Sequence, residues 1–99
     1  MRSLSLFGAT MLAGAAYAED VCRVLVLSGG GSNGAWEAGV LYGMLNGGNP
    51  ADYEWDVVTG VSAGSINTSA IAGWKKGEES EMVSWLSDLW LNLHTDDVW

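Results

Sequence analysis

Two glycine-rich motifs in this sequence combine residue types that can carry out acyl-transfer chemistry. The first is Gly29-Gly30-Gly31-Ser32-Asn33-Gly34, and the second is Gly60-Val61-Ser62-Ala63-Gly64. A serine hydroxyl attacks a carbonyl effectively when a tight turn presents its Oγ and donors await the charge that develops on the oxygen. Ser62 could be such a nucleophile, and the first motif could supply the backbone N–H donors.

Each motif follows a short apolar run that predicts a strand. Val21 to Leu27 is rich in Val and Leu, which is typical of a strand buried on both faces of a parallel sheet and would also bury the thiol of Cys22. A second strand is predicted over residues 56–59, and residues 34–46 between them predict a helix that Gly47-Gly48 ends. Because such crossovers are right-handed in nearly all folds, both strands should end at one edge of the sheet, where the two motifs meet.

Two further helices are predicted after the serine. Residues 63–74 are rich in small side chains that would let a helix pack closely beneath the turn, and Gly77 follows as a stop. A last helix from about Glu78 carries apolar residues at spacings of three and four, which we expect to face the core: Met82, Trp85, Leu86, Leu89, Trp90 and Leu93. The order β-α-β-α predicts an α/β fold with a parallel sheet.

The first motif has a second interpretation, because dinucleotide-binding folds use Gly-x-Gly-x-x-Gly to place a helix N-terminus against pyrophosphate. That site needs an acid about 20 residues on, at the end of the next strand. Asp52 and Glu54 precede that strand and Asp56 stands at its start, so none of them lies at its end. The acid that would bind the ribose is thus misplaced, and a nucleotide-binding Rossmann-like module is the alternative interpretation. The second motif favours a hydrolase, because Gly-x-Ser-x-Gly between a strand and a helix is the setting of a nucleophile elbow.

Together the motifs resemble the patatin-like phospholipases, which are serine lipid acyl hydrolases, over residues 21–93. The resemblance implies a three-layer α/β/α sandwich, of which this chain holds the N-terminal β-α-β-α portion. It implies that Ser62 is the nucleophile, in an elbow from Gly60 to Gly64. It also implies an oxyanion hole made by Gly29, Gly30, Gly31, Gly34 and Ala63. Family members commonly have an acidic and a basic residue where this chain has Ser28 and Asn33.

The base that this resemblance implies is an aspartate in an Asp-Gly-Gly or Asp-Gly-Ala motif, which acts with the serine as a dyad and requires no metal or cofactor. No such motif follows Ser62, so we expect the aspartate beyond Trp99 and expect these 99 residues alone to be inactive. A triad of Ser62, Asp88 and His94 is disfavoured, because the last two lie on or just past one helix. A non-catalytic lipid-binding remnant is the other alternative.

The N-terminus has the features of a cleaved signal peptide over residues 1–18. Met1-Arg2 provides a positive start, residues 4–14 are apolar, and Ala16-Tyr17-Ala18 resembles a signal peptidase site. The apolar run is shorter than the roughly 20 residues that span a bilayer, so we expect secretion. Residues 19–99 would be an incomplete domain, since an α/β hydrolase commonly needs roughly twice that length.

The net charge of the chain indicates which classes of partner are disfavoured. Twelve acids face four Lys and Arg, and the net charge is −8, which disfavours nucleic acid. The expected partner is a lipid ester or phospholipid, with transient contact to a lipid surface. A single cysteine cannot form an internal disulfide, and no His or Cys lies at metal-binding spacing from it.

Overall fold

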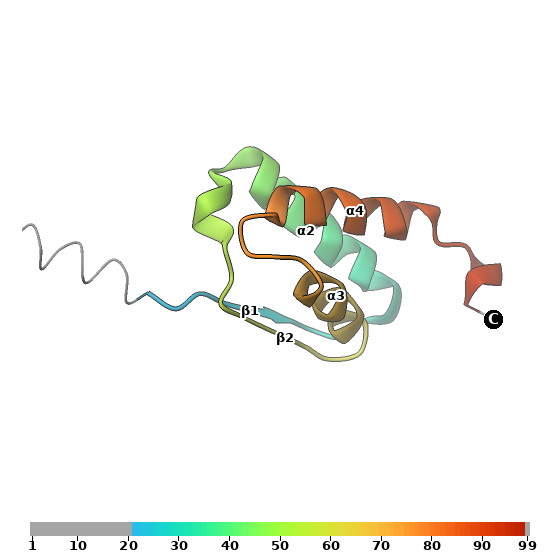
Figure 1. Ribbon diagram of the computed structural model, residues 1–99. Coiled ribbons are helices and arrows are strands. Elements are labelled where there is room, and N and C mark those ends of the chain that lie inside the picture. Colours follow the sequence, from blue (N-terminus) through green and yellow to red (C-terminus); the bar gives the residue numbers. More distant parts are fainter. Residues whose placement is uncertain (1–20, 99) are drawn as a thin grey trace, which may run out of the picture.

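The computed structural model describes residues 21–98. It contains two strands and three α-helices, joined by short 3₁₀ turns (Figure 1). In chain order these elements are β1 (Val24–Leu27), η1 (Gly31–Asn33), α2 (Gly34–Gly47), η2 (Pro50–Tyr53), β2 (Val57–Gly60), α3 (Ala63–Ala72), α4 (Glu79–Asn92) and η3 (Thr95–Asp97). The predicted β-α-β-α order and the α/β class are confirmed. The predicted signal peptide lies outside the described residues.

The two strands pair in parallel, with Leu27 opposite Gly60 at their carboxyl ends. The Val61 N–H donates to the Leu27 carbonyl at 3.1 Å, which continues this pairing one residue past β2. As predicted, the first glycine motif and the serine turn therefore leave the sheet at the same edge, and Figure 1 shows both on the side toward the C-terminus.

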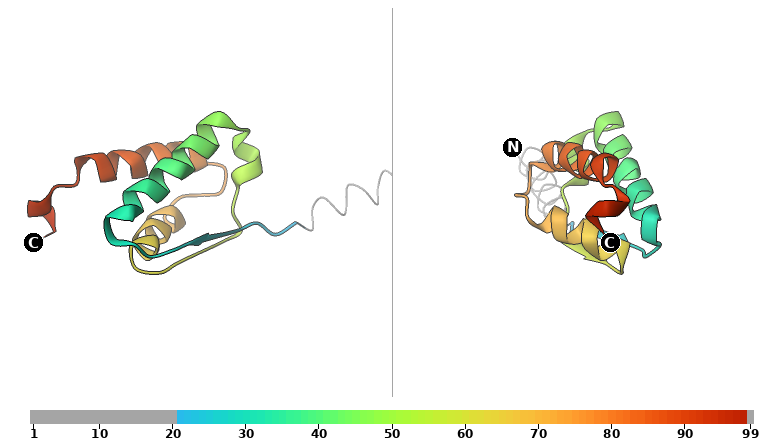
Figure 2. Two further views of the ribbon diagram at one scale, coloured as in Figure 1. Left: turned by 180° about the vertical axis from the view of Figure 1, so that it is seen from behind. Right: turned by 90° about the vertical axis from the view of Figure 1, so that its right-hand side faces the viewer.

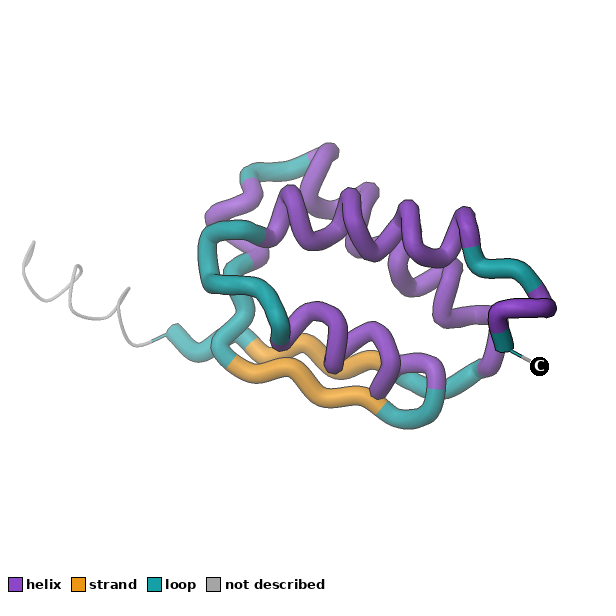
Figure 3. Tube along the Cα trace, turned by 45° about the vertical axis from the view of Figure 1, so that its right-hand side comes forward, coloured by secondary structure: helices purple, strands orange, loops and turns teal. Residues whose placement is uncertain are grey.

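All three α-helices lie on one face of the two-stranded sheet, with α3 next to the strands and α2 and α4 above it (Figures 1 and 3). The core between the sheet and the helices includes Leu27, Leu41, Leu45, Met82 and Leu86. A parallel sheet of this kind exposes one face unless helices cover both. The described residues thus form two layers of the predicted sandwich.

The outer face of the sheet corrects two sequence predictions. Val24 and Val26 are 53% and 71% exposed, so the first strand is not buried on both faces within the described residues. Its alternation is that of a half-buried strand, with Leu25 and Leu27 facing the helices. Cys22 is also exposed and not buried, because β1 begins two residues after it.

The apolar stripe of α4 is narrower than its sequence suggests. Met82 and Leu86 are fully buried, and so is Val83, which the predicted stripe omitted. Trp85, Leu89 and Leu93 are 46%, 38% and 41% exposed, so their assignment to the core was wrong. The reason is that α4 packs mainly against α2, along the side that carries residues 82, 83 and 86.

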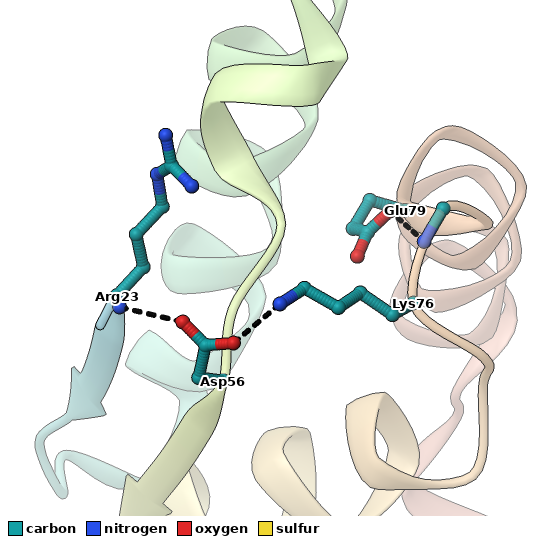
Figure 4. Close-up of polar contacts among 5 residues, drawn as sticks. Arg23, Asp56, Lys76 and Glu79 are labelled. Atoms are coloured by element: carbon teal, nitrogen blue, oxygen red, sulfur yellow. Dashed lines mark hydrogen bonds and ion pairs between the residues drawn. The ribbon is translucent and has the colours of Figure 1, made fainter. Parts of the chain in front are cut away.

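The two ends of the molecule differ in character (Figure 2). One end holds both glycine motifs and the C-terminal end of α4. At the other end Asp56 joins three segments, because its carboxylate accepts the Arg23 N–H at 2.8 Å and pairs with the Lys76 ammonium (Figure 4). The hydrogen bond from Lys76, supported by that from Arg23, lowers the pKa of Asp56, and Asp56 in turn raises the pKa of Lys76.

Candidate active site

Ser62 occupies a strained turn between β2 and α3. Its φ of 56° and ψ of −121° make it the one non-glycine residue with positive φ in the described part of the chain. Such a conformation costs about 1–3 kcal/mol and persists only where the surroundings enforce it. The result is an exposed serine at the N-terminus of a helix, which is the geometry of a nucleophile elbow.

Two glycines make this turn possible, because the neighbouring backbone leaves no room for a side chain at either position. A Cβ on Gly60 would lie 2.8 Å from the Ser65 nitrogen and still closer to the Gly64 carbonyl oxygen. A Cβ on Gly64 would lie 2.6 Å from the Ser28 carbonyl oxygen. Because these neighbours are backbone atoms, they cannot rotate away. The spacing Gly-x-Ser-x-Gly is therefore a steric requirement of the turn.

The first glycine motif packs directly against the serine. A Cβ on Gly29 would lie 3.1 Å from the Ser62 Cβ and 3.9 Å from its Oγ. Gly31 has a φ of 58°, a left-handed conformation that turns the chain into α2. The backbone amides of Gly30, Gly31 and Ala63 donate to no backbone carbonyl among residues 21–98. These three amides are therefore without a backbone acceptor in the described part of the chain.

Gly34 has a different place in the site. Its N–H is directed to the Gly31 carbonyl within the turn, so it is already engaged. A Cβ at this position would lie 2.6 Å from Cζ2 of Trp90 and 3.1 Å from the Ala63 Cβ. The absence of a side chain at Gly34 thus lets the start of α2 touch the start of α3 and the indole from α4.

A buried polar network, which we call the Asn67 cluster, ties these three helices together. Asn67 is fully buried on α3. Its Nδ2 donates to the Gly34 carbonyl and to Oε2 of Glu37, both at 3.0 Å, and its Oδ1 accepts Nε1 of Trp90 at 2.8 Å. The cluster consists of Gly34, Glu37, Asn67 and Trp90. It fixes the helix that follows the glycine turn against the helix that follows Ser62.

Ser28 and Asn33, the two positions that depart from the family pattern, both contact residues near the first glycine motif. The Ser28 hydroxyl lies 3.5 Å from Oε1 of Glu37, a long contact at the edge of the Asn67 cluster. Asn33 packs over Gly30, since a Cβ on that glycine would lie 3.1 Å from the Asn33 Nδ2. Both side chains are uncharged, so the backbone amides and the helix N-termini are the positive groups that this turn offers.

Ser62 lines a cavity of about 600 Å³. Six of the residues that line it are apolar: Ala35, Ala63, Ile66, Trp90, Leu93 and Val98. Of all the lining residues, His94 is the only titratable one. The cavity thus combines an exposed hydroxyl with an apolar wall, which suits a ligand that has a polar group and an apolar chain.

His94 and Asp88 occupy different places. His94 shares the cavity with Ser62, and its backbone N–H donates to Oδ2 of Asp97 at 2.8 Å. Asp88 lies in a separate hollow with Gly39 and Tyr42. Sequence reasoning set both residues aside, but the structure brings His94 to the cavity and leaves Asp88 outside it.

Neither a metal cluster nor a membrane-spanning helix is found in residues 21–98. No three His, Cys, Asp or Glu side chains in that range are grouped to hold a metal ion. None of its helices is long and apolar enough to cross a bilayer.

The fold and the site define a class of α/β protein in which a parallel strand enters a strained serine turn beside a glycine-rich anion turn. The family model described as patatin-like phospholipase matches residues 25–98. The chain therefore belongs to the patatin-like phospholipase family, and it corresponds to the N-terminal part of that domain. Members of this family are generally esterases or phospholipases that act on lipids. No curated protein and no solved structure matches the chain.

Proposed function

We propose that Ser62 is the nucleophile of a lipid acyl hydrolase and that the substrate is a carboxylic ester of a lipid. One observation carries the proposal: a strained, exposed serine at a helix N-terminus lies beside a glycine turn in which the Gly30 and Gly31 amides donate to no backbone carbonyl among residues 21–98. The proposal is supported by the family match over residues 25–98, which include both motifs, because members of this family are generally esterases or phospholipases.

The proposed reaction proceeds through an acyl-enzyme. The Ser62 Oγ attacks the ester carbonyl carbon and gives its proton to a base, while the amides of Gly30, Gly31 and Ala63 donate to the oxyanion. The tetrahedral intermediate collapses, and the alcohol leaves with a proton returned by the base. Water then attacks the acyl group by the same route and releases a fatty acid and free Ser62.

The base is the part of the proposal that these 99 residues do not supply in the form that the family resemblance implies. No Asp-Gly-Gly or Asp-Gly-Ala follows Ser62. We propose a Ser-Asp dyad in which the aspartate comes from outside this sequence. The 99 residues alone would then hold a correctly shaped nucleophile of low reactivity.

Two further parts of the proposal concern the substrate and its location. The acyl chain would lie along the apolar wall formed by Ile66, Trp90 and Leu93, with its carbonyl at Ser62. Secretion would bring the protein to lipid outside the cell, and it rests on the signal-peptide pattern of residues 1–18. N-terminal sequencing of the exported protein, with cleavage after Ala18 as the expected result, tests that part.

The nucleophile can be tested without the missing aspartate, by supplying a base from solution. The chain is incubated with p-nitrophenyl butyrate, with and without imidazole, and the acylated residue is identified by peptide mass spectrometry. Because the donors are already in place, we expect acylation at Ser62 to rise with imidazole concentration and with pH. Ser62→Ala should abolish it.

The matched control is Ser69→Ala, which removes an exposed hydroxyl bonded to the Ser65 carbonyl in the same helix. This variant should be acylated at Ser62 as fast as the original chain. Acylation of Ser62 no faster than of Ser69, with imidazole present, would contradict the proposal and favour a non-catalytic lipid-binding remnant.

A further inference from the structure

The mouth of the Ser62 cavity is formed by exposed apolar side chains. Ile66, Leu93 and Val98 all line the cavity, and they are 57%, 41% and 57% exposed. We call these three residues the apolar rim. They come from α3, from the residue after α4 and from the residue after η3, so three separate segments bring apolar surface to one opening.

The positive charges of the described residues lie away from this rim. The described residues contain three Lys and Arg side chains, Arg23, Lys75 and Lys76. The Arg23 backbone N–H and the Lys76 ammonium both contact the Asp56 carboxylate, as Figure 4 shows, and Lys75 lines the hollow that also contains Asp56 and Lys76. Asp56 immediately precedes β2, whereas Ser62 follows it, so the cations lie at the opposite end of the sheet from the rim.

Acidic residues lie close to the rim instead. Asp96 and Asp97 form part of η3, directly before Val98. Anionic lipid surfaces attract proteins through Lys and Arg near the contact, and they repel carboxylates. Exposed apolar side chains, by contrast, enter the boundary between headgroups and acyl chains of any lipid surface.

We propose that the apolar rim docks on a lipid surface whose headgroups carry no net negative charge, with the Asp56 end pointing into water. This proposal rests on the proposed function, because it gives the lipid ester a direct path from the surface into the Ser62 cavity. It adds the orientation of the protein and the charge class of the surface.

Docking is measured by co-sedimentation with vesicles of ether-linked phosphatidylcholine, which has no ester to hydrolyse. We expect the protein to sediment with these vesicles, and to sediment less as ether-linked phosphatidylglycerol replaces part of the phosphatidylcholine. The double variant Ile66→Ser, Val98→Ser should bind about tenfold more weakly, since two apolar contacts are lost. Circular dichroism verifies that each variant is folded.

The control is Val26→Ser, which changes a more exposed valine, at 71%, on the outer face of the sheet. It should leave vesicle binding unchanged. The proposal is overturned by any of four results: no sedimentation with phosphatidylcholine, stronger binding to the anionic vesicles, a larger loss in Val26→Ser than in the double variant, or a dimer in solution that the double variant dissociates. Ether lipids separate this outcome from the acylation of Ser62, which is measured on a soluble ester.

Discussion

At the scale of single residues, Ser62 is held in a conformation that its own side chain disfavours. The positive φ suits glycine, and a residue with a Cβ is strained there whatever its side chain. The glycines at 60 and 64 and the backbone of β1 enforce the turn from outside. The site therefore stores strain at the residue that we propose as the nucleophile.

Two substitutions of Ser62 measure this strain, since both remove the hydroxyl and differ only in the Cβ. We expect Ser62→Gly to have a free energy of unfolding about 1 kcal/mol above that of Ser62→Ala, after allowance for the greater freedom of glycine in the unfolded chain. Urea unfolding followed by circular dichroism gives both values. Equal stabilities would mean that the turn relaxes when the hydroxyl is absent.

At the scale of elements, the Asn67 cluster determines how the three helices meet. Asn67 has no exposed surface, and both ends of its side-chain amide are bonded to other helices. Removal of one member leaves buried polar groups without partners, which costs more than the bond itself contributes. The cluster is thus a specific joint between α2, α3 and α4.

We expect Asn67→Ala to lower the free energy of unfolding by about 1–3 kcal/mol, because it leaves the Trp90 indole and the Gly34 carbonyl unsatisfied. The control is Asn46→Ala, whose exposed side chain donates to the Tyr42 carbonyl within its own helix. That change should stay within about 0.5 kcal/mol. Urea unfolding compares the two variants, and a similar loss in both would show that the cluster is not specific.

The same elements show what the sequence could and could not predict. Both strands were predictable from short apolar runs, and the turn at Ser62 was predictable because Gly60 and Gly64 carry a local steric requirement that is visible as spacing. The Asn67 cluster was not, because Glu37 and Asn67 resemble ordinary polar helix residues until α2 and α3 are packed together. Cys22 and the outer valines were misassigned, since apolar composition does not reveal how many faces of a sheet are covered.

At the scale of the whole molecule, Asp56 joins the start of β1, the start of β2 and the loop before α4. Its lowered pKa means that the folded state favours the carboxylate. This contribution is present above the unfolded pKa of about 3.8 and is lost as the pH falls below it. The raised pKa of Lys76 adds a contribution that is present below 10.5 and is lost as the pH rises above it.

Lys76→Met therefore should lower the melting temperature at pH 7 by a few degrees at most, since the pair is exposed to water. It should have a smaller effect at a second, acidic pH that is low enough to protonate Asp56. Thermal unfolding followed by circular dichroism at both pH values tests this. The control Lys75→Met removes an equal charge that the described residues do not pair with an acid. An effect of Lys76→Met that does not change with pH would rule out the ion pair as its cause.

The parallel direction of β1 and β2 has a consequence for the unassigned base. Every strand that joins this sheet in the same direction must end at the edge where Ser62 stands. A carboxylate at the tip of such a strand reaches the serine through sheet polarity, however far away it lies in the sequence. The direction of the two short strands thus already specifies the edge of the sheet at which a carboxylate from a further parallel strand would lie beside Ser62.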